Sequence, residues 1–475
     1  MRILLVEDNA TFAAELESAI RGIPHCEVDT VTSQDEAMHC LGHEFYDLII
    51  LDREISPSAD RALESSKEHG WNLFLYIEAN APGIPVRFLT GFWDTGLAED
   101  LMSYARPSRA CGAGATVPLY SGLAKNKVHL LKREVEDMAK RISAIDEIPV
   151  IIENRNSPAP MEEERVLRLF ANLRGGVAVR ATPFTDGLSG ASVHKVAVLN
   201  ASQEVLEVCV AKIGPSKEIH TEQTKHRDYF TKLKGGCVPN GTEIIDSGAG
   251  SWSGAFYSLA AEDALTLFST ISTDVVRSCD VVRGIETAQE NWRNSGTQYT
   301  RSVRQIRQRF IGNTKLAKIS DLTSDLGLPD AESSNVISNE CVQHRDLHGA
   351  NVLVGANHAF HLIDYAEAQT DCSCSDALML ELSILFHKDA VELRENWPNA
   401  EQLRHWDDLE VYLEGCPFPN FVRSCREWAE RSAGSPEEIL ATAYAISLRQ
   451  LQYDDVDKKI GLAIAKRCLN RLQIN

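Results

Sequence analysis

The sequence predicts an α/β domain with a parallel sheet at the start of the chain, followed by an α+β region with a small β-rich lobe and a larger helical lobe. Up to Thr90, short apolar runs alternate with helical patterns, which is typical of a parallel sheet with helices on both faces. From Val177 the pattern changes to short valine-rich strands, and after about Ala261 it is mostly helical. A chain of 475 residues is too long for one core of ordinary size, so two or three domains are expected.

The elements of the first part follow from the spacing of its apolar residues. The run from Ile3 to Val6 is typical of a buried strand. A helix is predicted next, because Phe12, Leu16 and Ile20 recur every four residues and Gly22 can end it. The other elements predicted in this part are strands over residues 26–31, 48–51 and 86–89 and a helix near residues 34–41.

Helical spacing returns before the β-rich lobe and dominates after it. Residues 128–145 and 161–173 are predicted to be helical, with a polar, proline-containing linker at 153–160 between them. In the β-rich lobe, Val208, Val210 and Lys212 alternate and therefore share one face of a strand. The remaining predictions are a strand that holds Val193, Val196 and Val198, and packing helices over residues 440–451 and 460–472.

Composition and charge limit the possible functions. Apolar residues make up 44% of the chain and charged residues 24%, as in folded soluble proteins. The net charge of -20 repels nucleic-acid backbones and anionic lipids, so neither is expected as a partner. The start, MRILLVEDN, is too short and too charged for a signal peptide, and no stretch approaches a membrane span. We therefore expect a cytoplasmic protein.

The twelve cysteines are expected to be thiols in a reducing compartment. Cys372 and Cys374 form the tightest pair, but no second pair or histidine lies nearby in the sequence. We interpret them as structural or incidental thiols rather than as a metal or redox site.

Carboxylates follow two of the predicted parallel strands. Glu7 and Asp8 come directly after the first strand, and Asp52 comes directly after the third. Because the carboxyl ends of parallel strands meet at one edge, these side chains should lie together and bind Mg²⁺, which prefers hard oxygen ligands. Thr90 closes the fourth predicted strand, and its hydroxyl would face the same edge.

These segments resemble the receiver domain of two-component response regulators. The resemblance covers roughly the first 125 residues and rests on LLVEDN, LIILDR around Asp52, VRFLTG around Thr90 and GWNLFLYI at residues 70–77. It implies a doubly wound, five-stranded parallel sheet of the CheY-like or flavodoxin-like type. It also implies that Asp52 accepts a phosphoryl group, that Glu7 and Asp8 help to hold Mg²⁺, and that Thr90 senses the phosphoryl group. A histidine kinase would be the phosphodonor, and a receiver-mediated dimer is possible.

One expected receiver residue is displaced in the sequence. Receivers carry a lysine at the end of the fifth strand, but the segment GAGATVPLYSG places Tyr120 or Ser121 there. Lys125 and Lys127 follow shortly afterwards as candidates to take its place. The alternative interpretation is a receiver fold that is kept only as a docking or dimerising module.

The second group of polar residues lies in QHRDLHGANVLV and HLIDYAEA. Phosphoryl transfer needs a carboxylate that orients a hydroxyl and accepts its proton, and Asp346 suits this task. Phosphoryl transfer also needs oxygen ligands for the Mg²⁺ that binds the nucleotide phosphates, and Asn351 and Asp364 suit this second task. Residues 352–354 and 360–363 are predicted to form a hairpin, which would bring Asn351 and Asp364 together.

This pattern resembles protein-kinase-like enzymes, and aminoglycoside and choline phosphotransferases in particular. Their catalytic loop also has the form H-x-D-L-H-x-x-N, and their metal loop has I-D-x, as in Ile363-Asp364-Tyr365. Asp376 also matches, as a structural helix-start residue. The resemblance covers about Val177 to the C-terminus and implies a two-lobed α+β fold that uses ATP and Mg²⁺. His344 and His348 are interpreted as hydrogen-bonding scaffold residues rather than metal ligands.

The β-rich lobe has candidates for nucleotide binding. The turn TDGLSGAS, with Gly187 and Gly190, would cover the phosphates, and Lys212 resembles the strand lysine of kinases that contacts them. Glu222 is the first choice as partner of that lysine, and Glu218 is the second. Residues 257–261 are a candidate hinge for the adenine. The predicted divisions are a receiver at 1–127, a helical linker region at 128–176, an N-lobe at 177–261 and a C-lobe at 262–475.

Three functions fit these residues. The first is a phosphorelay protein whose receiver regulates a phosphotransferase acting on a protein or small-molecule hydroxyl. The second is a catalytically weak, kinase-fold scaffold that binds a signalling partner in response to the receiver. The third is an aminoglycoside or small-alcohol kinase, since an acidic surface attracts cationic substrates. The fused receiver favours signalling over the third function.

Overall fold

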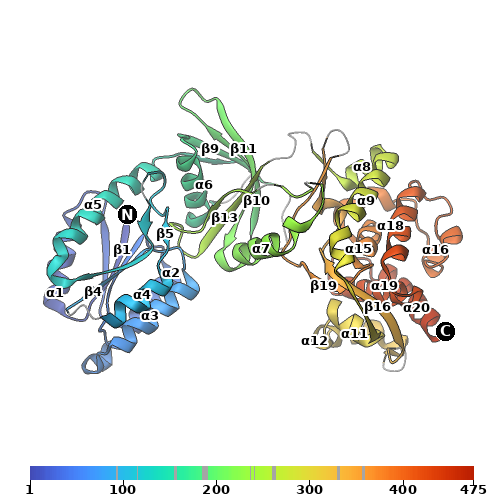
Figure 1. Cartoon of the computed structure of the whole chain (residues 1–475), viewed down its shortest axis with the longest axis horizontal. Coiled ribbons are helices and arrows are strands. Elements are labelled where there is room, and N and C mark those ends of the chain that lie inside the picture. Colours follow the sequence, from blue (N-terminus) through green and yellow to red (C-terminus); the bar gives the residue numbers. More distant parts are fainter. Residues whose placement is uncertain are drawn as a thin grey trace. The chain divides into compact units, whose positions relative to one another are not determined.

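The computed structural model describes the chain apart from residues 92–94, 115, 154–157, 184–190, 236, 240, 259–263, 329–331, 356–358 and 475. The chain forms two compact units (Figure 1). The first contains Met1–Thr221 and Asn240–Leu259, and the second contains Glu222–Pro239 and Ala260–Asn475. Among the described helices, none is both long enough and apolar enough to span a bilayer.

The first unit begins with a five-stranded sheet in the order β2-β1-β3-β4-β7, in which every pairing is parallel. Its strands are β1 (Arg2–Val6), β2 (Glu27–Val31), β3 (Leu48–Asp52), β4 (Val86–Thr90) and β7 (Tyr120–Ala124). Its helices are α1 (Ala10–Arg21), α2 (Gln34–His43), α3 (Lys67–Asn80), α4 (Thr95–Tyr104) and α5 (Val128–Asp146).

Alternate residues of these strands face opposite sides of the sheet. Leu4 and Val6 belong to the core that contains apolar residues of α2, α3 and α4, whereas Ile3 and Leu5 belong to the core with α1 and α5. Both faces are therefore covered, which explains why the strands are continuous apolar runs. The predicted doubly wound, five-stranded parallel sheet is confirmed.

The expected position of the fifth strand is wrong. Residues 107–108 and 117–118 lie outside the main sheet and form a small antiparallel pair, β5 (Pro107–Ser108) with β6 (Val117–Pro118). Tyr120 and Ser121 begin the fifth strand instead of ending it, because β7 pairs in parallel with β4 from Tyr120 to Ala124. Lys125 is therefore the first residue after the strand, opposite the end of β4.

The second part of the first unit is a six-stranded sheet in the order β12-β13-β11-β10-β9-β8. The pairing of β8 with β9 is parallel and the others are antiparallel. Helix α6 (Met161–Leu173) covers one face, where the Phe170 ring stacks on Phe256 at 3.8 Å between centroids. The strands are β8 (Val150–Ile152), β9 (Ala178–Pro183), β10 (Ser192–Leu199), β11 (Val205–Pro215), β12 (Gly241–Ile245) and β13 (Trp252–Ser258).

The region predicted as a helical linker is thus divided among three places. Helix α5 packs in the receiver core through Leu131, Val135 and Met138, β8 extends the six-stranded sheet, and α6 lies on that sheet. The chain leaves α5 at Asp146 and enters β8 at Val150, so only a short turn joins α5 to the six-stranded sheet. Within the predicted linker at 153–160, residues 154–157 lie outside the described residues.

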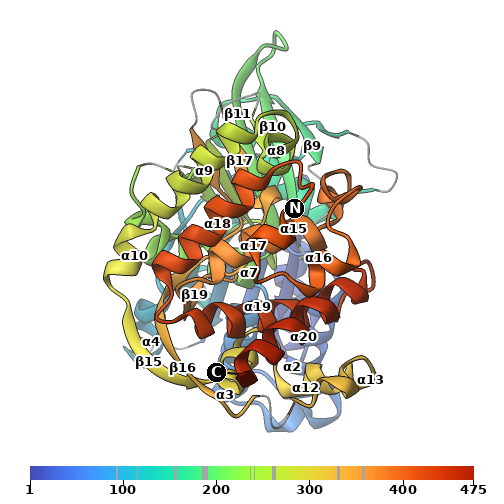
Figure 2. The ribbon, with the colours of Figure 1, turned by 90° about the vertical axis from the view of Figure 1, so that its right-hand side faces the viewer.

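The second unit is mainly helical (Figure 2). All 12 residues of α15 (Ser375–Phe386) are buried, and α18 (Pro419–Ser432) and α19 (Pro436–Gln450) pack on this helix. The predicted packing helices near the end correspond to α19 and α20 (Lys458–Ile474). The shorter or peripheral helices are α8 (Leu267–Thr273), α9 (Val275–Ala288), α10 (Glu290–Asn294), α11 (Val303–Phe310), α12 (Asn313–Ala317), α13 (Ser320–Thr323), α16 (Ala400–Arg404) and α17 (Leu409–Tyr412).

Two small sheets carry the polar loops of the second unit. One has the order β14-β17-β18 and contains the hairpin of β17 (Val352–Val354) and β18 (Phe360–Leu362), with β14 (Leu265–Thr266) at its edge. The other consists of β15 (Thr297–Ser302), β16 (Asn335–Gln343) and β19 (Gln369–Cys372). Helix α7 (Ser216–Asp228) begins in the first unit and ends in the second.

Candidate functional site

The receiver sheet brings three carboxylates together at its carboxyl edge. Glu7 follows β1, Asp52 ends β3, and one ligand oxygen each of Glu7, Asp8 and Asp52 lies within 4.8 Å of the others. Glu7 is 0% exposed and Asp52 is 6% exposed. The Asp8 carboxylate accepts a hydrogen bond from the Ser65 hydroxyl. These are the three residues that the sequence predicts as Mg²⁺ ligands.

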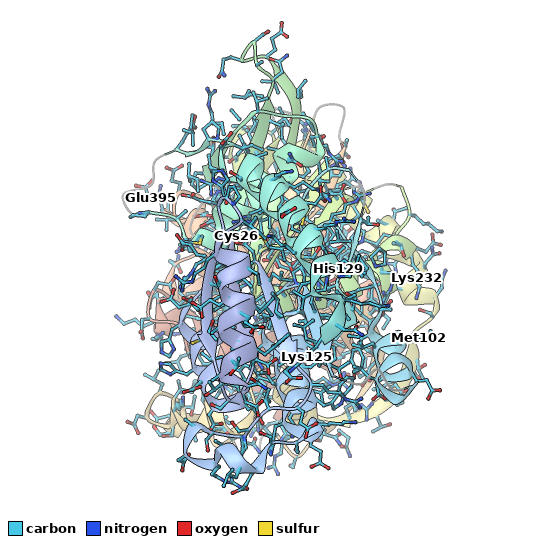
Figure 3. The ribbon with its side chains drawn as sticks, turned by 90° about the vertical axis from the view of Figure 1, so that its left-hand side faces the viewer. Cys26, Met102, Lys125, His129, Lys232 and Glu395 are labelled. Atoms are coloured by element: carbon cyan, nitrogen blue, oxygen red, sulfur yellow. The ribbon has the colours of Figure 1, made fainter. Side chains whose placement is uncertain are left out.

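Lys125, which is labelled in Figure 3, supplies positive charge to this cluster. Its ammonium nitrogen lies 2.7 Å from Asp52 Oδ2 and 2.7 Å from Glu7 Oε2. It also lies 4.8 Å from the centroid of the Phe12 ring, at a distance typical of cation–π contacts. Lys127 is exposed, and no described contact joins its side chain to the cluster. Of the two lysines that the sequence offers, Lys125 is the one beside Asp52.

Burial and charge set the protonation of the cluster. Burial and the neighbouring Asp52 charge raise the pKa of Glu7 to about 7, against the opposing effect of Lys125. Burial also raises the pKa of Asp52. Burial disfavours the charged form of Lys125, but its hydrogen bonds to Asp52 and Glu7 leave the pKa of its ammonium raised.

The chemistry of this donor set fits Mg²⁺. Three carboxylates with only one described cation among them carry excess negative charge, and a divalent cation with oxygen ligands would neutralise it. Glu7, Asp8 and Asp52 would hold such an ion. Thr90 ends β4 next to this edge and is 5% exposed.

In the second unit, the residues predicted for phosphoryl transfer lie on adjoining loops. The Asn351 side-chain amide donates to the Asp346 carbonyl at 2.9 Å. The Ile363 backbone N–H donates to the Asn351 carbonyl at 3.1 Å, and Val352 pairs with Leu362 in the hairpin. Asn351 is thereby joined to Asp346 on one side and to the residue before Asp364 on the other.

A buried carboxylate holds the backbone of the loop that precedes Asp346. Asp376, which is 0% exposed, accepts the backbone N–H groups of His344 at 2.8 Å and Arg345 at 3.0 Å, and the Gln289 amide at 2.8 Å. Arg345 has φ of 71°, a conformation that costs energy for a residue with a side chain. The role of Asp376 is thus wider than that of the helix-start residue that the sequence suggests. Asp364 also has a positive φ, of 63°.

The carboxylate of Asp346 is 36% exposed and has two basic neighbours. Arg449 Nη2 lies 3.6 Å from Asp346 Oδ1, and the same guanidinium donates to the Arg345 carbonyl at 3.2 Å. Sequence reasoning missed Arg449, since it lies in α19, far along the chain, in an ordinary helical pattern. His348 Nε2 lies 3.7 Å from Asp346 Oδ2.

The two histidines of the loop are held differently. Burial, with a contribution from neighbouring His387, lowers the pKa of His348 to about 3, so His348 is neutral near pH 7. Its ring lies 4.4 Å from that of His387. The His344 Nε2 atom lies 3.0 Å from the Ile363 carbonyl, which ties the loop of Asp346 to the loop of Asp364. These contacts fit the interpretation of both histidines as scaffold residues.

The nucleotide-binding candidates are distributed over both units. Lys212 lies on β11 opposite Val193 of β10 and is 8% exposed. Gly187 and Gly190 lie outside the described residues, as does most of the predicted hinge at 257–261. Glu222 is 3% exposed and belongs to the second unit, whereas Glu218 is exposed on α7.

The cysteines are all free thiols. Cys372 and Cys374 are completely buried, and burial raises the pKa of both thiols well above its usual range. Cys372 contacts the Ser338 hydroxyl at 3.5 Å, and Cys374 contacts the Thr442 hydroxyl at 3.6 Å.

Solved structures are similar to this chain in two separate parts. The receiver domain of a putative LuxO repressor protein from Vibrio parahaemolyticus is 23% identical, covers 30% of this chain and 94% of its own, and has a TM-score of 0.23. The receiver domain of a Francisella response regulator is 17% identical, with coverages of 30% and 98% and a TM-score of 0.22. The apo form of a thermostable mutant of aminoglycoside phosphotransferase APH(4)-Ia is 16% identical, with coverages of 62% and 94% and a TM-score of 0.35.

Neither a protein-family model nor a curated protein sequence matches the chain. Because the structural similarities are partial and their TM-scores are low, the two folds rest on the strand order and loop geometry described above. The N-terminal part has the doubly wound strand order described above, and the larger remaining part has a β-rich lobe followed by a mainly helical region.

Proposed function

We propose that this protein belongs to a phosphorelay, in which phosphorylation of Asp52 regulates a Mg-ATP-dependent phosphotransferase in the same chain. The observation that carries the proposal is the contact of 2.7 Å between Lys125 and Asp52. An acceptor aspartate beside acidic residues and a fixed ammonium is suited to receive a phosphoryl group, because the ammonium neutralises charge that arrives with it. This contact also removes the main reason for regarding the receiver as a docking module only.

The phosphoacceptor step would form a bond between a carboxylate oxygen of Asp52 and phosphorus. The bond between phosphorus and the donor group breaks, and the donor keeps that electron pair. The donor is proposed to be the phosphohistidine of a histidine kinase. Mg²⁺ held by Glu7, Asp8 and Asp52 would neutralise phosphoryl oxygens during this step.

The phosphotransferase step would use the loops of the second unit. Asp346 is proposed to orient a substrate hydroxyl and to accept its proton, and Arg449, 3.6 Å from one of its carboxylate oxygens, would help to orient it. Asn351 and Asp364 are proposed as ligands of nucleotide-bound Mg²⁺, with Lys212 on the nucleotide phosphates. The substrate is proposed to be a hydroxyl group of a protein or of a small molecule.

The test is incubation of the full chain with γ-labelled ATP and Mg²⁺, with both released phosphate and labelled protein measured. We expect the Asp346→Asn variant to lose at least about 99% of the turnover. The Asp389→Asn variant is the matched control, since Asp389 is an exposed aspartate in the same unit, 3.8 Å from His387. Wild-type protein that binds no nucleotide would contradict the enzymatic part and favour the scaffold function.

A further inference from the structure

Helix α6 contacts the receiver through a buried ion pair. Arg165 Nη1 lies 2.8 Å from Asp47 Oδ1, and both side chains are 5% exposed. The same guanidinium lies 3.0 Å from Asp146 at the end of α5 and 5.3 Å from the Phe45 ring. Removing one partner of a buried pair leaves an uncompensated charge, so this contact fixes α6 to the receiver.

The other end of α6 is fixed to the segment of the receiver between α4 and β7. Asn172 Oδ1 accepts the Ala113 backbone N–H at 2.7 Å. Gly112, with φ of 73°, comes so close that a Cβ atom there would lie 2.2 Å from Asn172 Oδ1. Nearby, the backbones of Gly83 and Gly248 are joined by a hydrogen bond of 2.9 Å. The residues between α4 and β7, which displace the fifth strand, therefore form part of a fitted interface.

On its opposite side, α6 holds the strand that follows the predicted nucleotide loop. Glu163 Oε1 accepts the Ser192 hydroxyl at 2.7 Å and lies 2.7 Å from His194 Nε2. Glu163 is 1% exposed and His194 is 2% exposed. Ser192 is the first residue of β10, and Val193 pairs with Lys212. A buried carboxylate with two hydrogen-bond partners fixes the start of this strand.

The receiver contacts of α6 lie at the edge of the sheet opposite the phosphoacceptor. Asp47 immediately precedes β3, whereas Asp52 is the last residue of the same strand. The second carboxylate oxygen of Asp47 accepts the Arg2 backbone N–H at 2.7 Å, at the start of β1. The proposed phosphoacceptor Asp52 thus lies at the end of β3, and the ion pair with α6 lies directly before the start of the same strand.

We propose that α6 couples the receiver to β10, the strand that pairs with the strand of Lys212, with the Asp47–Arg165 pair as the receiver contact and Glu163 as a positioning residue for β10. The proposal rests on the proposed function and names how that regulation acts. Phosphorylation of Asp52 displaces β3, the Asp47–Arg165 ion pair transmits the displacement to α6, and Glu163 transmits it to β10. The affinity for nucleotide changes as a result.

The experiment measures the dissociation constant of a fluorescent ATP analogue for the full chain, before and after phosphorylation with acetyl phosphate. In wild type we expect a change of about fivefold or more, the size of an ordinary allosteric coupling. Glu163→Gln and Asp47→Asn should each reduce that change to less than about twofold, with unaltered phosphorylation of Asp52. Glu164→Gln is the matched control and should keep the wild-type change, because Glu164 forms only a partly exposed pair with Arg168.

The outcomes separate the two proposals. Wild-type coupling that persists in both variants overturns the role of α6 and leaves the proposed function standing. Nucleotide binding with no response to phosphorylation overturns the coupling and the regulatory part of the function. No nucleotide binding overturns the function and the coupling with it.

A second measurement covers variants that fail to fold. Hydrogen exchange of the wild-type chain is measured with and without acetyl phosphate. The protection of α6 and β10 should change, and the protection of α20 should stay the same. Unchanged protection in α6 and β10 overturns the inference.

Discussion

The ammonium nitrogen of Lys125 lies 2.7 Å from Asp52 Oδ2 and 2.7 Å from Glu7 Oε2. One cation thus joins the residues at the ends of β1 and β3. Lys125 follows β7 directly, so the end of β7 sets its position. The position is set by the pairing of Thr90 with Ala124, which fixes where β7 ends.

Replacement of Lys125 should impair phosphorylation of the receiver. Lys125→Met removes the charge that faces Asp52, so we expect the rate of acetyl phosphate labelling to fall by about tenfold or more. Lys127→Met is the control, because this exposed lysine lies two residues further on and should label at the wild-type rate. Equal loss in the two variants would show that general charge, rather than the contact with Asp52, governs the rate.

The stability of the receiver should depend on pH through Glu7. Its pKa is raised to about 7 in the folded protein, so the folded state binds a proton that the unfolded state loses above its ordinary pKa of 4.5. Stability is therefore expected to fall by roughly 2–3 kcal/mol as the pH rises from about 4.5 to 7 without divalent cations. Thermal melting with and without Mg²⁺ measures this effect.

Two comparisons make the pH experiment specific. Glu7→Gln should remove the fall in stability that Glu7 contributes, because the amide does not titrate. Mg²⁺ should restore stability at pH 7 in wild type, since the cation favours the charged carboxylates. A change in melting temperature from pH 4.5 to 7 without Mg²⁺ that is the same in wild type and Glu7→Gln would contradict the assignment, because the comparison cancels the opposite effect of buried histidines such as His348.

The Asp376 carboxylate should be necessary for the catalytic loop. Asp376→Asn replaces one acceptor oxygen with an NH₂ group that faces the backbone donors of His344 and Arg345. We expect the free energy of unfolding to fall by about 3 kcal/mol and ATP turnover to fall with it. Urea unfolding followed by tryptophan fluorescence gives the first quantity. Loss of turnover with full stability would mean that Asp376 acts in the chemistry instead.

The close approach at Gly112 should be measurable against a matched glycine. Gly112 and Gly175 have φ of 73° and 70°, but a Cβ atom would lie 2.2 Å from Asn172 at Gly112 and meet nothing within 4 Å at Gly175. Gly175→Ala should cost about 1 kcal/mol for the backbone alone, and Gly112→Ala about 1–2 kcal/mol more. Equal losses in the free energy of unfolding for the two variants would mean that the interface at Gly112 adjusts to accommodate the added Cβ atom.

Local sequence patterns predicted the elements with regular spacing. The apolar runs before Glu7 and Asp52 identify buried parallel strands, and the close spacing of Asp346, Asn351 and Asp364 places them on adjoining loops. The fifth strand was predicted too early, because Val117 and Pro118 pair with Ser108 and Pro107 and not with the main sheet, a pairing that the local sequence does not indicate. Arg449 and Arg165 act through contacts with residues about 100 or more positions away, and such contacts leave no local pattern.

The measurement that tests the central claim most directly is the rate of phosphoryl transfer from ATP by the full chain, before and after treatment with acetyl phosphate and Mg²⁺. Wild type and Asp52→Asn are compared at the same nucleotide concentration, and Asp346→Asn defines the background. We predict that acetyl phosphate changes the wild-type rate by about fivefold or more and leaves the rate of Asp52→Asn unchanged. A wild-type rate that stays the same while Asp52 is fully phosphorylated would contradict the account.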